Sequence, residues 1–146
     1  MVTVKDILAQ KGAGVLVTTP ATTVLDAADM MNERGTGSVL VVEEGALVGI
    51  FTERDLMRRV VAVRRDPAAT ALREVMTTAL VTCTPDASLA DCGALMSERR
   101  IRHLPVLETG GTVIGVITTG DLLAQELREK DATIQHLESF VFYVRQ

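Results

Sequence analysis

The sequence predicts a protein of mixed helix and strand (α/β, of the α+β kind), in which two β-α-β-β-α repeats pack face to face about a pseudo-twofold axis. The octet GIFTERDL at Gly49–Leu56 returns as GVITTGDL at Gly115–Leu122, 66 residues later. Upstream of the octet the two halves match at a shift of 65, so one residue is inserted near Gly110 in the second copy. Neither copy is long enough to build a good core alone, and we therefore expect the two to pack together.

Each repeat is expected to begin with a short apolar strand that runs into a proline, Val15–Thr18 in the first copy and Leu80–Thr84 in the second. A helix then begins at Thr23 and at Ser88, each followed three residues later by an aspartate. A hydroxyl and a carboxylate at this spacing satisfy the unpaired N–H groups of a first helical turn. Apolar positions at helical spacing predict the buried faces: Val24, Ala27, Ala28 and Met31, then Leu89, Cys92, Gly93 and Met96.

Two further strands follow in each copy and are joined by a short turn that contains glycine. They are expected at Val39–Val42 and Leu47–Phe51, and again at Leu104–Leu107 and Val113–Ile117. Short turns of this kind predict antiparallel hairpins. The strands are continuously apolar, which indicates that both faces of each sheet are covered. A second helix is expected after each octet.

The composition is that of a globular protein, with 47% hydrophobic and 23% charged residues among 146. A net charge of −4 gives no general attraction to nucleic acid or to an anionic membrane surface. Arginines nevertheless gather in two segments, which suits a small phosphorylated ligand, although a solvated helix face explains most of them equally well. These arginines are Arg54, Arg58, Arg59, Arg64 and Arg65, then Arg99, Arg100 and Arg102.

The expected location is the cytoplasm. No apolar run approaches the roughly 18 residues of a membrane span, and the first residues, MVTVKDILAQ, lack the pattern of a signal peptide. Two cysteines are too few for a disulfide framework or a zinc site. Cys92 is expected in the core, and Cys83 is the thiol whose redox role stays open.

The octet admits two interpretations. Thr52 and Asp55 form a Thr-x-x-Asp pattern, which caps a helix and needs no ligand. The same pattern at a helix start is also suited to phosphate, because N–H groups and the positive end of the helix dipole lie there. Gly49 interrupts an otherwise β-branched strand, and glycine within a strand often marks the close approach of another group. Arg54 lies in the first turn, against the dipole, where a bound anion would offset its cost.

The stretch IRHLPV, Ile101–Val106, stands in the second copy where the first has TGSVLV. Arg102 and His103 therefore replace Gly37 and Ser38. A single histidine at a strand start is as compatible with a satisfied side chain as with a ligand contact. Pro105 removes a hydrogen-bond donor from the strand and predicts an irregular start or an edge position.

These motifs resemble those of a tandem pair of CBS domains, also called a Bateman module. The resemblance covers about Val4 to Leu127 and depends on the stretches VMTTALVTCTPDASL, ERRIRHLPV and GIFTERDL. It is strongest to small CBS-pair proteins that stand alone. It implies a first repeat with its N-terminal segment at 1–66, a linker and second repeat at 67–127, and a helical tail at 128–146.

The resemblance implies that the clefts between the repeats bind AMP, ADP, ATP, NAD or S-adenosylmethionine as ligands rather than catalytic cofactors. Each cleft would take Thr and Asp from one repeat, for phosphate and ribose, and the first strand and hairpin entrance of the other repeat, for the base. Cleft A would comprise Thr52, Arg54, Asp55, Thr77, Leu80, Thr82, Ile101, Arg102 and His103. Cleft B would comprise Thr118, Asp121, Gly12, Val15, Val17, Thr36, Gly37 and Ser38. Cleft A collects the basic side chains and is expected to hold phosphate, whereas cleft B is empty, holds a nucleoside or binds weakly.

An enzyme is not expected, because the sequence shows no nucleophile–base pair at a recognisable spacing and no cluster of metal ligands. We expect a nucleotide-sensing regulatory module that responds to cellular energy state and signals to a separate protein. The alternative is a structural interaction protein with vestigial clefts.

A homodimer is expected, with the C-terminal tail involved in assembly or partner contact. From Leu122 the chain predicts one long helix that carries an apolar stripe beyond the second repeat. Family resemblance adds that CBS pairs commonly associate through their helices. Folding back onto the same chain is the alternative for the tail. Its apolar and aromatic residues are Ile134, Leu137, Phe140, Val141, Phe142, Tyr143 and Val144.

Overall fold

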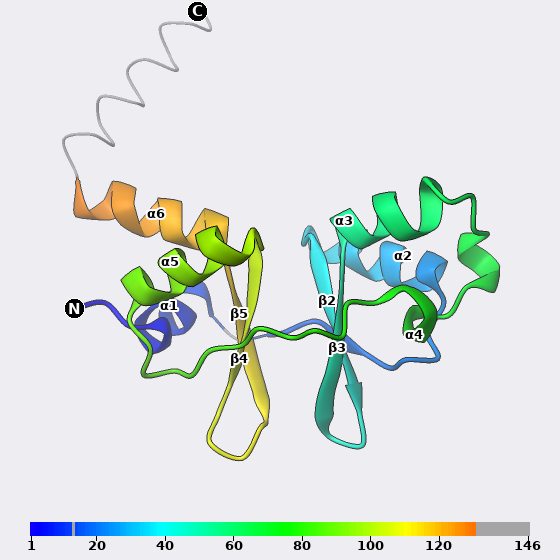
Figure 1. Cartoon of the computed structure of the whole chain (residues 1–146). Helices are drawn as coiled ribbons and strands as arrows, with labels where there is room; N and C mark the ends of the chain where they lie inside the picture. The colour runs from blue at the N-terminus through cyan, green and yellow to red at the C-terminus, as the bar shows by residue number, and fades with distance from the viewer. Residues whose placement is uncertain (13, 131–146) are drawn as a thin grey trace, which may run out of the picture.

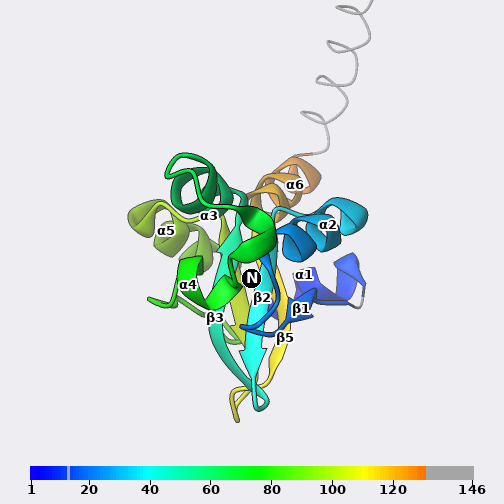
Figure 2. The same ribbon diagram turned by 90° about the vertical axis from the view of Figure 1, so that its right-hand side faces the viewer.

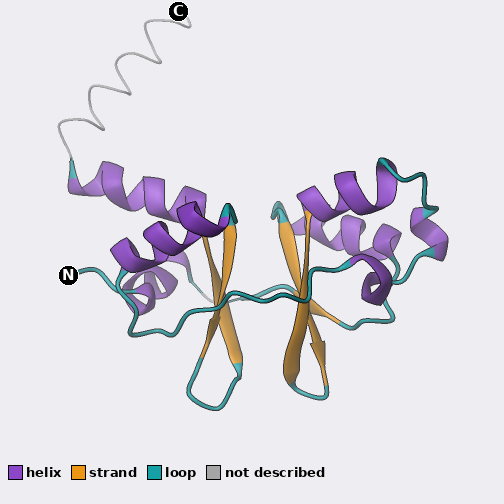
Figure 3. Ribbon diagram, in the orientation of Figure 1, coloured by secondary structure: helices purple, strands orange, loops and turns teal. Residues whose placement is uncertain are grey.

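Two small β-sheets face each other, and helices cover their outer sides, in this computed structural model, which describes residues 1–12 and 14–130 (Figure 1). The elements in chain order are α1 (Val4–Lys11), β1 (Val17–Thr18), α2 (Val24–Arg34), β2 (Ser38–Glu43), β3 (Ala46–Thr52), α3 (Glu53–Asp55), η1 (Leu56–Val61), η2 (Pro67–Ala69), α4 (Leu72–Val75), α5 (Leu89–Arg99), β4 (His103–Leu107), β5 (Val113–Thr118) and α6 (Thr119–Glu129). Figure 3 shows the same arrangement by type of element, with the two hairpins side by side at the centre. The predicted fold class is confirmed.

Both predicted hairpins are antiparallel. Ser38 pairs with Thr52 at the open end of β2–β3, and His103 pairs with Thr118 at the same place in β4–β5. Each hairpin has a register shift at one equivalent point, between Val41 and Val42 in the first and one step after Val106 in the second. The duplication therefore extends to irregularities of the sheet.

The first strand differs between the copies. In the first, β1 runs parallel to β2, and the N–H of Leu40 donates to the carbonyl of Leu16 at 3.0 Å. Pro105 stands where Leu40 stands and has no N–H to donate, so the second copy retains one parallel bridge, Cys83 to Val106. The prediction of a full strand over Leu80–Thr84 is wrong for this reason.

The hydroxyl part of each predicted helix cap forms, whereas neither aspartate returns a hydrogen bond to the cap residue. Thr23 accepts a hydrogen bond from the N–H of Asp26 at 3.1 Å, and Ser88 accepts one from the N–H of Asp91 at 3.0 Å. Cys92 is 2% exposed on the buried face of α5, as expected. Both sheet faces are covered, since Val39, Leu40 and Val41 of β2 are all fully buried.

Each half has its own hydrophobic core. Each core also contains a helix that, in the sequence, comes just before the other repeat. The first core includes Leu72 and Val75 of α4, and the second includes Val4 and Ile7 of α1. Backbone hydrogen bonds hold each of these helices in place, for example from the N–H of Leu72 to the carbonyl of Thr22 at 2.8 Å. The two halves are thus interlocked through their N-terminal and linking segments.

Helices of both repeats gather at one end of the molecule. Figures 1 and 2 both place α2, α3, α5 and α6 at the end opposite the hairpin turns. Helix α6 ends at Glu129, and the predicted apolar tail from Ile134 onward lies outside the described residues. Over 1–12 and 14–130, no helix combines the length and apolar character that crossing a membrane requires.

Candidate nucleotide cleft

The predicted cleft A corresponds to a cavity of about 790 Å³ between the first repeat and the second. The end of β3, helix α3 and part of η1 line it from the first repeat, residues 101–103 line it from the second, and Thr77 lines it from the linking segment. Its lining residues are Ile50, Thr52, Glu53, Arg54, Asp55, Leu56, Met57, Arg58, Val61, Thr77, Ile101, Arg102 and His103.

Seven of the nine residues that sequence reasoning assigned to cleft A line this hollow. The other two, Leu80 and Thr82, are half-buried and do not line it. Sequence reasoning missed Met57, Arg58 and Val61, although their spacing of three, four and seven residues from Arg54 predicts one helix face. These three side chains form the helical wall of the cleft and are half of the six lining residues that were overlooked; the others are Ile50, Glu53 and Leu56.

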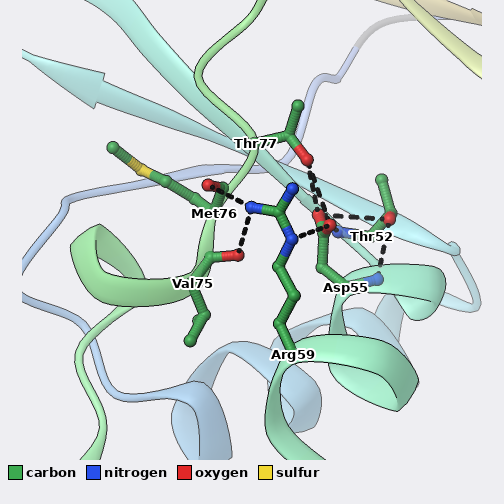
Figure 4. Close-up of polar contacts among 6 residues, drawn as sticks. All are labelled: Thr52, Asp55, Arg59, Val75, Met76 and Thr77. Atoms are coloured by element: carbon green, nitrogen blue, oxygen red, sulfur yellow. Dashed lines mark hydrogen bonds and ion pairs between the residues drawn. The ribbon is translucent and has the colours of Figure 1, made fainter.

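Asp55 is the most heavily hydrogen-bonded side chain of the cleft, and it is only 6% exposed (Figure 4). Its Oδ2 accepts from the N–H of Thr52 at 3.0 Å and from the Thr52 hydroxyl at 3.3 Å. In return Thr52 Oγ1 accepts from the N–H of Asp55 at 3.2 Å. The capping interpretation of the octet is therefore correct, and any ligand must use a motif that already has a structural role.

Two more side chains fix this carboxylate from the linking segment and the next turn. The Thr77 hydroxyl donates to Asp55 Oδ1 at 3.0 Å. Arg59 Nε lies 3.7 Å from the same oxygen, while its Nη1 donates to the carbonyl of Met76 at 3.1 Å (Figure 4). Thr77 lines the cleft and Arg59 does not. The position of Asp55 thus depends on the linking segment as well as on its own helix.

Arginines form a positively charged rim on the cleft. Arg54 Nη1 donates to the carbonyl of Arg100 at 2.9 Å, which ties the first repeat to the second. Within the described residues, neither Arg54 nor Arg102 forms an ion pair. An adjoining hollow of about 410 Å³ shares Arg54, Ile101 and Arg102 with the cleft, and Arg100 lines it as well.

Arg100 holds an unusual backbone conformation beside this rim. Its φ of 55° is left-handed, and it caps α5 at the place where Gly35 caps α2 with a φ of 64°. A side chain in this conformation is uncommon and costs free energy, so strain is stored next to the cleft in the second copy alone.

His103 lies between the two halves and is half-buried. Burial lowers its pKa, the nearby cations Arg102, Lys11 and Arg54 lower it further, and Glu53 opposes them. A Cβ atom at Gly37 would lie 3.2 Å from His103 Nε2 and would clash with the Glu53 carboxyl group. The absence of a side chain at Gly37 therefore lets the two repeats approach at this point.

Cleft B repeats the capping motif with different surroundings. Thr118 and Asp121 exchange hydrogen bonds of 2.8 and 3.1 Å, as Thr52 and Asp55 do. Gly120, Gly37 and Ser38 stand where cleft A has Arg54, Arg102 and His103. The remaining predicted residues are Gly12, Thr36, Val15 and Val17, of which Thr36 and Val15 are half-buried, whereas Gly12 and Val17 are exposed.

Lys11 is the cleft B residue that sequence reasoning missed. Its Nζ donates to Asp121 Oδ2 at 2.9 Å and to the carbonyl of Val116 at 2.8 Å. The shift of 65 places Gly12 opposite Thr77 and so conceals Lys11, whereas a shift of 66, as in the octet, aligns Lys11 with Thr77.

Gly49 and Gly115, the first residues of the two octets, leave room for side chains that pack against their strands. A Cβ atom on Gly49 would lie 2.5 Å from the sulfur of Met76, and one on Gly115 would lie 2.6 Å from Leu8 Cδ2. Met76 and Leu8 belong to the segments that cross from one repeat to the other. The close approach expected at these glycines is thus made by the protein itself.

The thiols lie away from the cleft chemistry. Burial raises the pKa of Cys83 to about 12, so this thiol is protonated at neutral pH and is a poor nucleophile. In the described part of the chain, no three side chains of the His, Cys, Asp and Glu types come together as a metal site would require.

Comparisons with known proteins agree with the fold and with the duplication. The family model described as CBS domain matches residues 4–62 and again 72–127. The CBS domain-containing protein YhcV of Bacillus subtilis is 36% identical over 132 residues, which cover 90% of this chain and 91% of YhcV. The crystal structure of the CBS domain protein NE2398 is 37% identical, covers 86% of this chain and 97% of its own, and has a TM-score of 0.82. The structure of CBSX2 in complex with AMP is 24% identical over 89% of this chain and 99% of its own, with a TM-score of 0.71, and this likeness is one of fold. The chain belongs to the CBS-domain family.

Proposed function

We propose that this chain is a non-catalytic regulatory module that binds an adenosine-containing nucleotide in cleft A and transmits the occupancy of that cleft to another protein. The observation that carries the proposal is a cleft of about 790 Å³ in which a Thr-x-x-Asp motif of one repeat faces Arg102 and His103 of the other. Clefts of 300–1,000 Å³ are usual for small ligands.

The chemistry of the lining suits a nucleotide. Ile50, Val61 and Ile101 provide apolar surface for a base, and Arg54, Arg58 and Arg102 provide positive charge for phosphate. The Asp55 carboxylate can accept hydrogen bonds from a ribose diol. Because most ligands of this class differ in their phosphate groups, the arginine rim is the part of the cleft that would discriminate among them.

A solved structure with the same fold supports the choice of ligand class. CBSX2 was solved in complex with AMP. That ligand belongs to CBSX2, and adenine nucleotides are therefore the first compounds to test on this chain.

The test is a binding panel of AMP, ADP, ATP, NAD and S-adenosylmethionine, measured by thermal shift and calorimetry. We expect a Kd between micromolar and millimolar for at least one nucleotide, which corresponds to about −8 to −4 kcal/mol. Arg102→Ala should weaken that binding about 10- to 100-fold, since a charge-assisted hydrogen bond contributes about 1.5–3 kcal/mol.

Arg99→Ala is the matched control for this variant, because Arg99 is exposed on α5 and does not line the cleft. Arg102 is preferred to Asp55 as the test position, because Asp55 also caps its helix. No response to any compound in the panel would contradict the sensor proposal and favour the structural alternative, in which the clefts are vestigial.

We further propose that the module is a homodimer that associates through its helical end. Exposed apolar side chains lie on three elements at that end, with Leu25 on α2 46% exposed, Val61 on η1 62% exposed and Leu123 on α6 56% exposed. Figures 1 and 2 place these elements together, opposite the hairpin turns. Contiguous exposed apolar surface marks association sites, and a second copy would cover it in both molecules at once.

Sedimentation of Leu25→Glu and Leu123→Glu tests this arrangement, since neither residue lines cleft A. We expect a dimer for the natural sequence and a shift toward monomer for both variants, because each change places a charge in the interface. Thr112→Glu, in the exposed turn at the opposite end, should leave the dimer intact. A natural sequence that sediments as a monomer at high micromolar concentration would refute the proposal and would favour coverage by the chain's own residues.

A further inference from the structure

Clefts A and B differ in the group that contacts the octet aspartate. In cleft A the N–H of Thr77 donates to the carbonyl of Ile50 at 2.9 Å, and its hydroxyl donates to Asp55 at 3.0 Å. In cleft B the corresponding acceptors are Val116 and Asp121, and the Lys11 ammonium donates to both, at 2.8 and 2.9 Å. One cation thus takes the place of two neutral donors.

The exchange alters the charge of the site. A threonine hydroxyl carries no charge and can rotate to serve as an acceptor itself. The cation at Asp55, Arg59, lies 3.7 Å from its Oδ1 and does not line cleft A. An ammonium group donates only, and it forms an ion pair with Asp121, whose side chain is 17% exposed. A ribose hydroxyl that enters cleft B must therefore compete with a charged partner for the Asp121 oxygen that the ammonium occupies.

Lys11 is held in this position by the fold. It is the last residue of α1, which is anchored in the second core through Val4 and Ile7. Gly12 follows with a φ of 84°, a left-handed conformation that favours glycine and ends the helix there. The ammonium consequently reaches the cleft from a rigid element rather than from a loop.

We propose that Lys11 is a specificity-determining residue that keeps the Asp121 cleft closed to ribose, so that the chain takes one nucleotide rather than two. This inference rests on the proposed function of cleft A. It also accounts for the distribution of charge, because the side with Lys11 is the side that lacks the arginines and the histidine of cleft A.

The test is the stoichiometry of binding, measured by calorimetry and equilibrium dialysis with AMP and with adenosine. The natural sequence should bind one molecule of AMP. Lys11→Met keeps the length of the side chain and removes its donors, and it should bind two. The second site should accept adenosine as well as AMP, because cleft B has no arginine to hold phosphate.

Two further variants make the result specific. Lys5→Met changes an exposed lysine of the same helix and should keep a stoichiometry of one. Adding Asp121→Ala to Lys11→Met should return the stoichiometry from two to one, which locates the new site. Thermal unfolding of each variant confirms that the fold is retained.

The outcomes separate this inference from the proposed function. Two sites in the natural sequence, or one site in both proteins, would overturn the inference and leave cleft A in place. No site in the natural sequence with one in Lys11→Met would support the inference and overturn the assignment of cleft A. No binding by either protein would overturn both.

Discussion

Asp55, which is buried, and His103, which is half-buried, are polar side chains that belong both to the fold and to the cleft. Asp55 caps its helix and accepts a hydrogen bond from the Thr77 hydroxyl, and among the described residues it is the one buried charged side chain. His103 starts β4 and lies against Gly37 of the opposite repeat. Since both are placed by backbone elements, a ligand meets them already oriented, which reduces the entropy lost on binding.

His103 predicts a pH dependence of stability. Its pKa is lowered in the folded protein by burial and by neighbouring cations. The unfolded chain, whose histidine has a pKa of about 6.5, therefore takes up a proton at a higher pH than the folded one. Stability should be fully present above about pH 6.5 and should fall as the pH drops below it, toward the folded-state pKa.

Urea unfolding at pH 7.5 and 5.5 measures this effect. His103→Gln cannot be protonated, and it should lose less stability between the two pH values than the natural sequence does. An equal loss in both proteins would show that other groups produce the pH dependence.

The sequence predicted residues that repeat and missed residues that do not. Thr52 and Asp55 were identified because their motif occurs in both copies. Arg102 and His103 were identified because they differ from the residues at the matching positions of the first copy. Lys11 was missed because the shift of 65 sets Gly12, and not Lys11, opposite Thr77. Side-chain spacing alone cannot reveal which of two equivalent cores a helix joins.

The duplicated elements diverge where a single residue changes the backbone hydrogen bonding. Pro105 shortens the first strand of the second copy. After Asp55 the chain continues as a π-helix over Leu56–Val61, in which the N–H of Ala62 donates to the carbonyl of Met57 at 2.9 Å. Helix α6, by contrast, is α-helical throughout its described length. π-Helical turns are frequent at functional sites, and this one carries the helical wall of cleft A. No sequence pattern predicted this π-helix, because the two segments follow the same octet.

Gly49→Ala tests how closely the linking segment packs on β3. A methyl group there would meet the Met76 sulfur at 2.5 Å and its Cγ at 2.9 Å. We expect a loss of about 1–3 kcal/mol in the free energy of unfolding, the usual range for overpacking a core. Combining it with Met76→Ala should recover part of that loss, because the clash is removed.

Gly110→Ala is the matched control for this change. Nothing lies within 4 Å of a Cβ atom at Gly110, and its φ is not left-handed. Its effect should stay within about 0.5 kcal/mol. Equal effects at Gly49 and Gly110 in urea unfolding would contradict the close packing.

At the scale of the whole molecule, the crossing of α1 and α4 couples the two repeats. Helix α1 joins the second core through Val4 and Ile7, and α4 joins the first core through Leu72 and Val75. The start of each helix pairs with the cap of α5 or α2, through the bridges Thr3 to Ser88 and Thr23 to Ala71. Neither core is complete without a segment from across the molecule. A ligand in the cleft between them therefore contacts both halves of one interlocked unit.

Ile7→Ala tests this coupling. Ile7 is 1% exposed in the core of the second repeat, although it precedes the first repeat in the chain. Truncating a buried isoleucine to alanine costs about 2–5 kcal/mol, which is a large fraction of the stability of a small domain. We expect urea unfolding to remain a single transition with a lower midpoint, and amide hydrogen exchange to quicken in α5, β4 and β5 as well as in α1. Lys5→Ala, on the exposed side of the same helix, should change stability by less than about 0.5 kcal/mol. If exchange quickened in α1 alone while the second core kept its protection, α1 would be a docked appendage and the interlocked arrangement would be refuted.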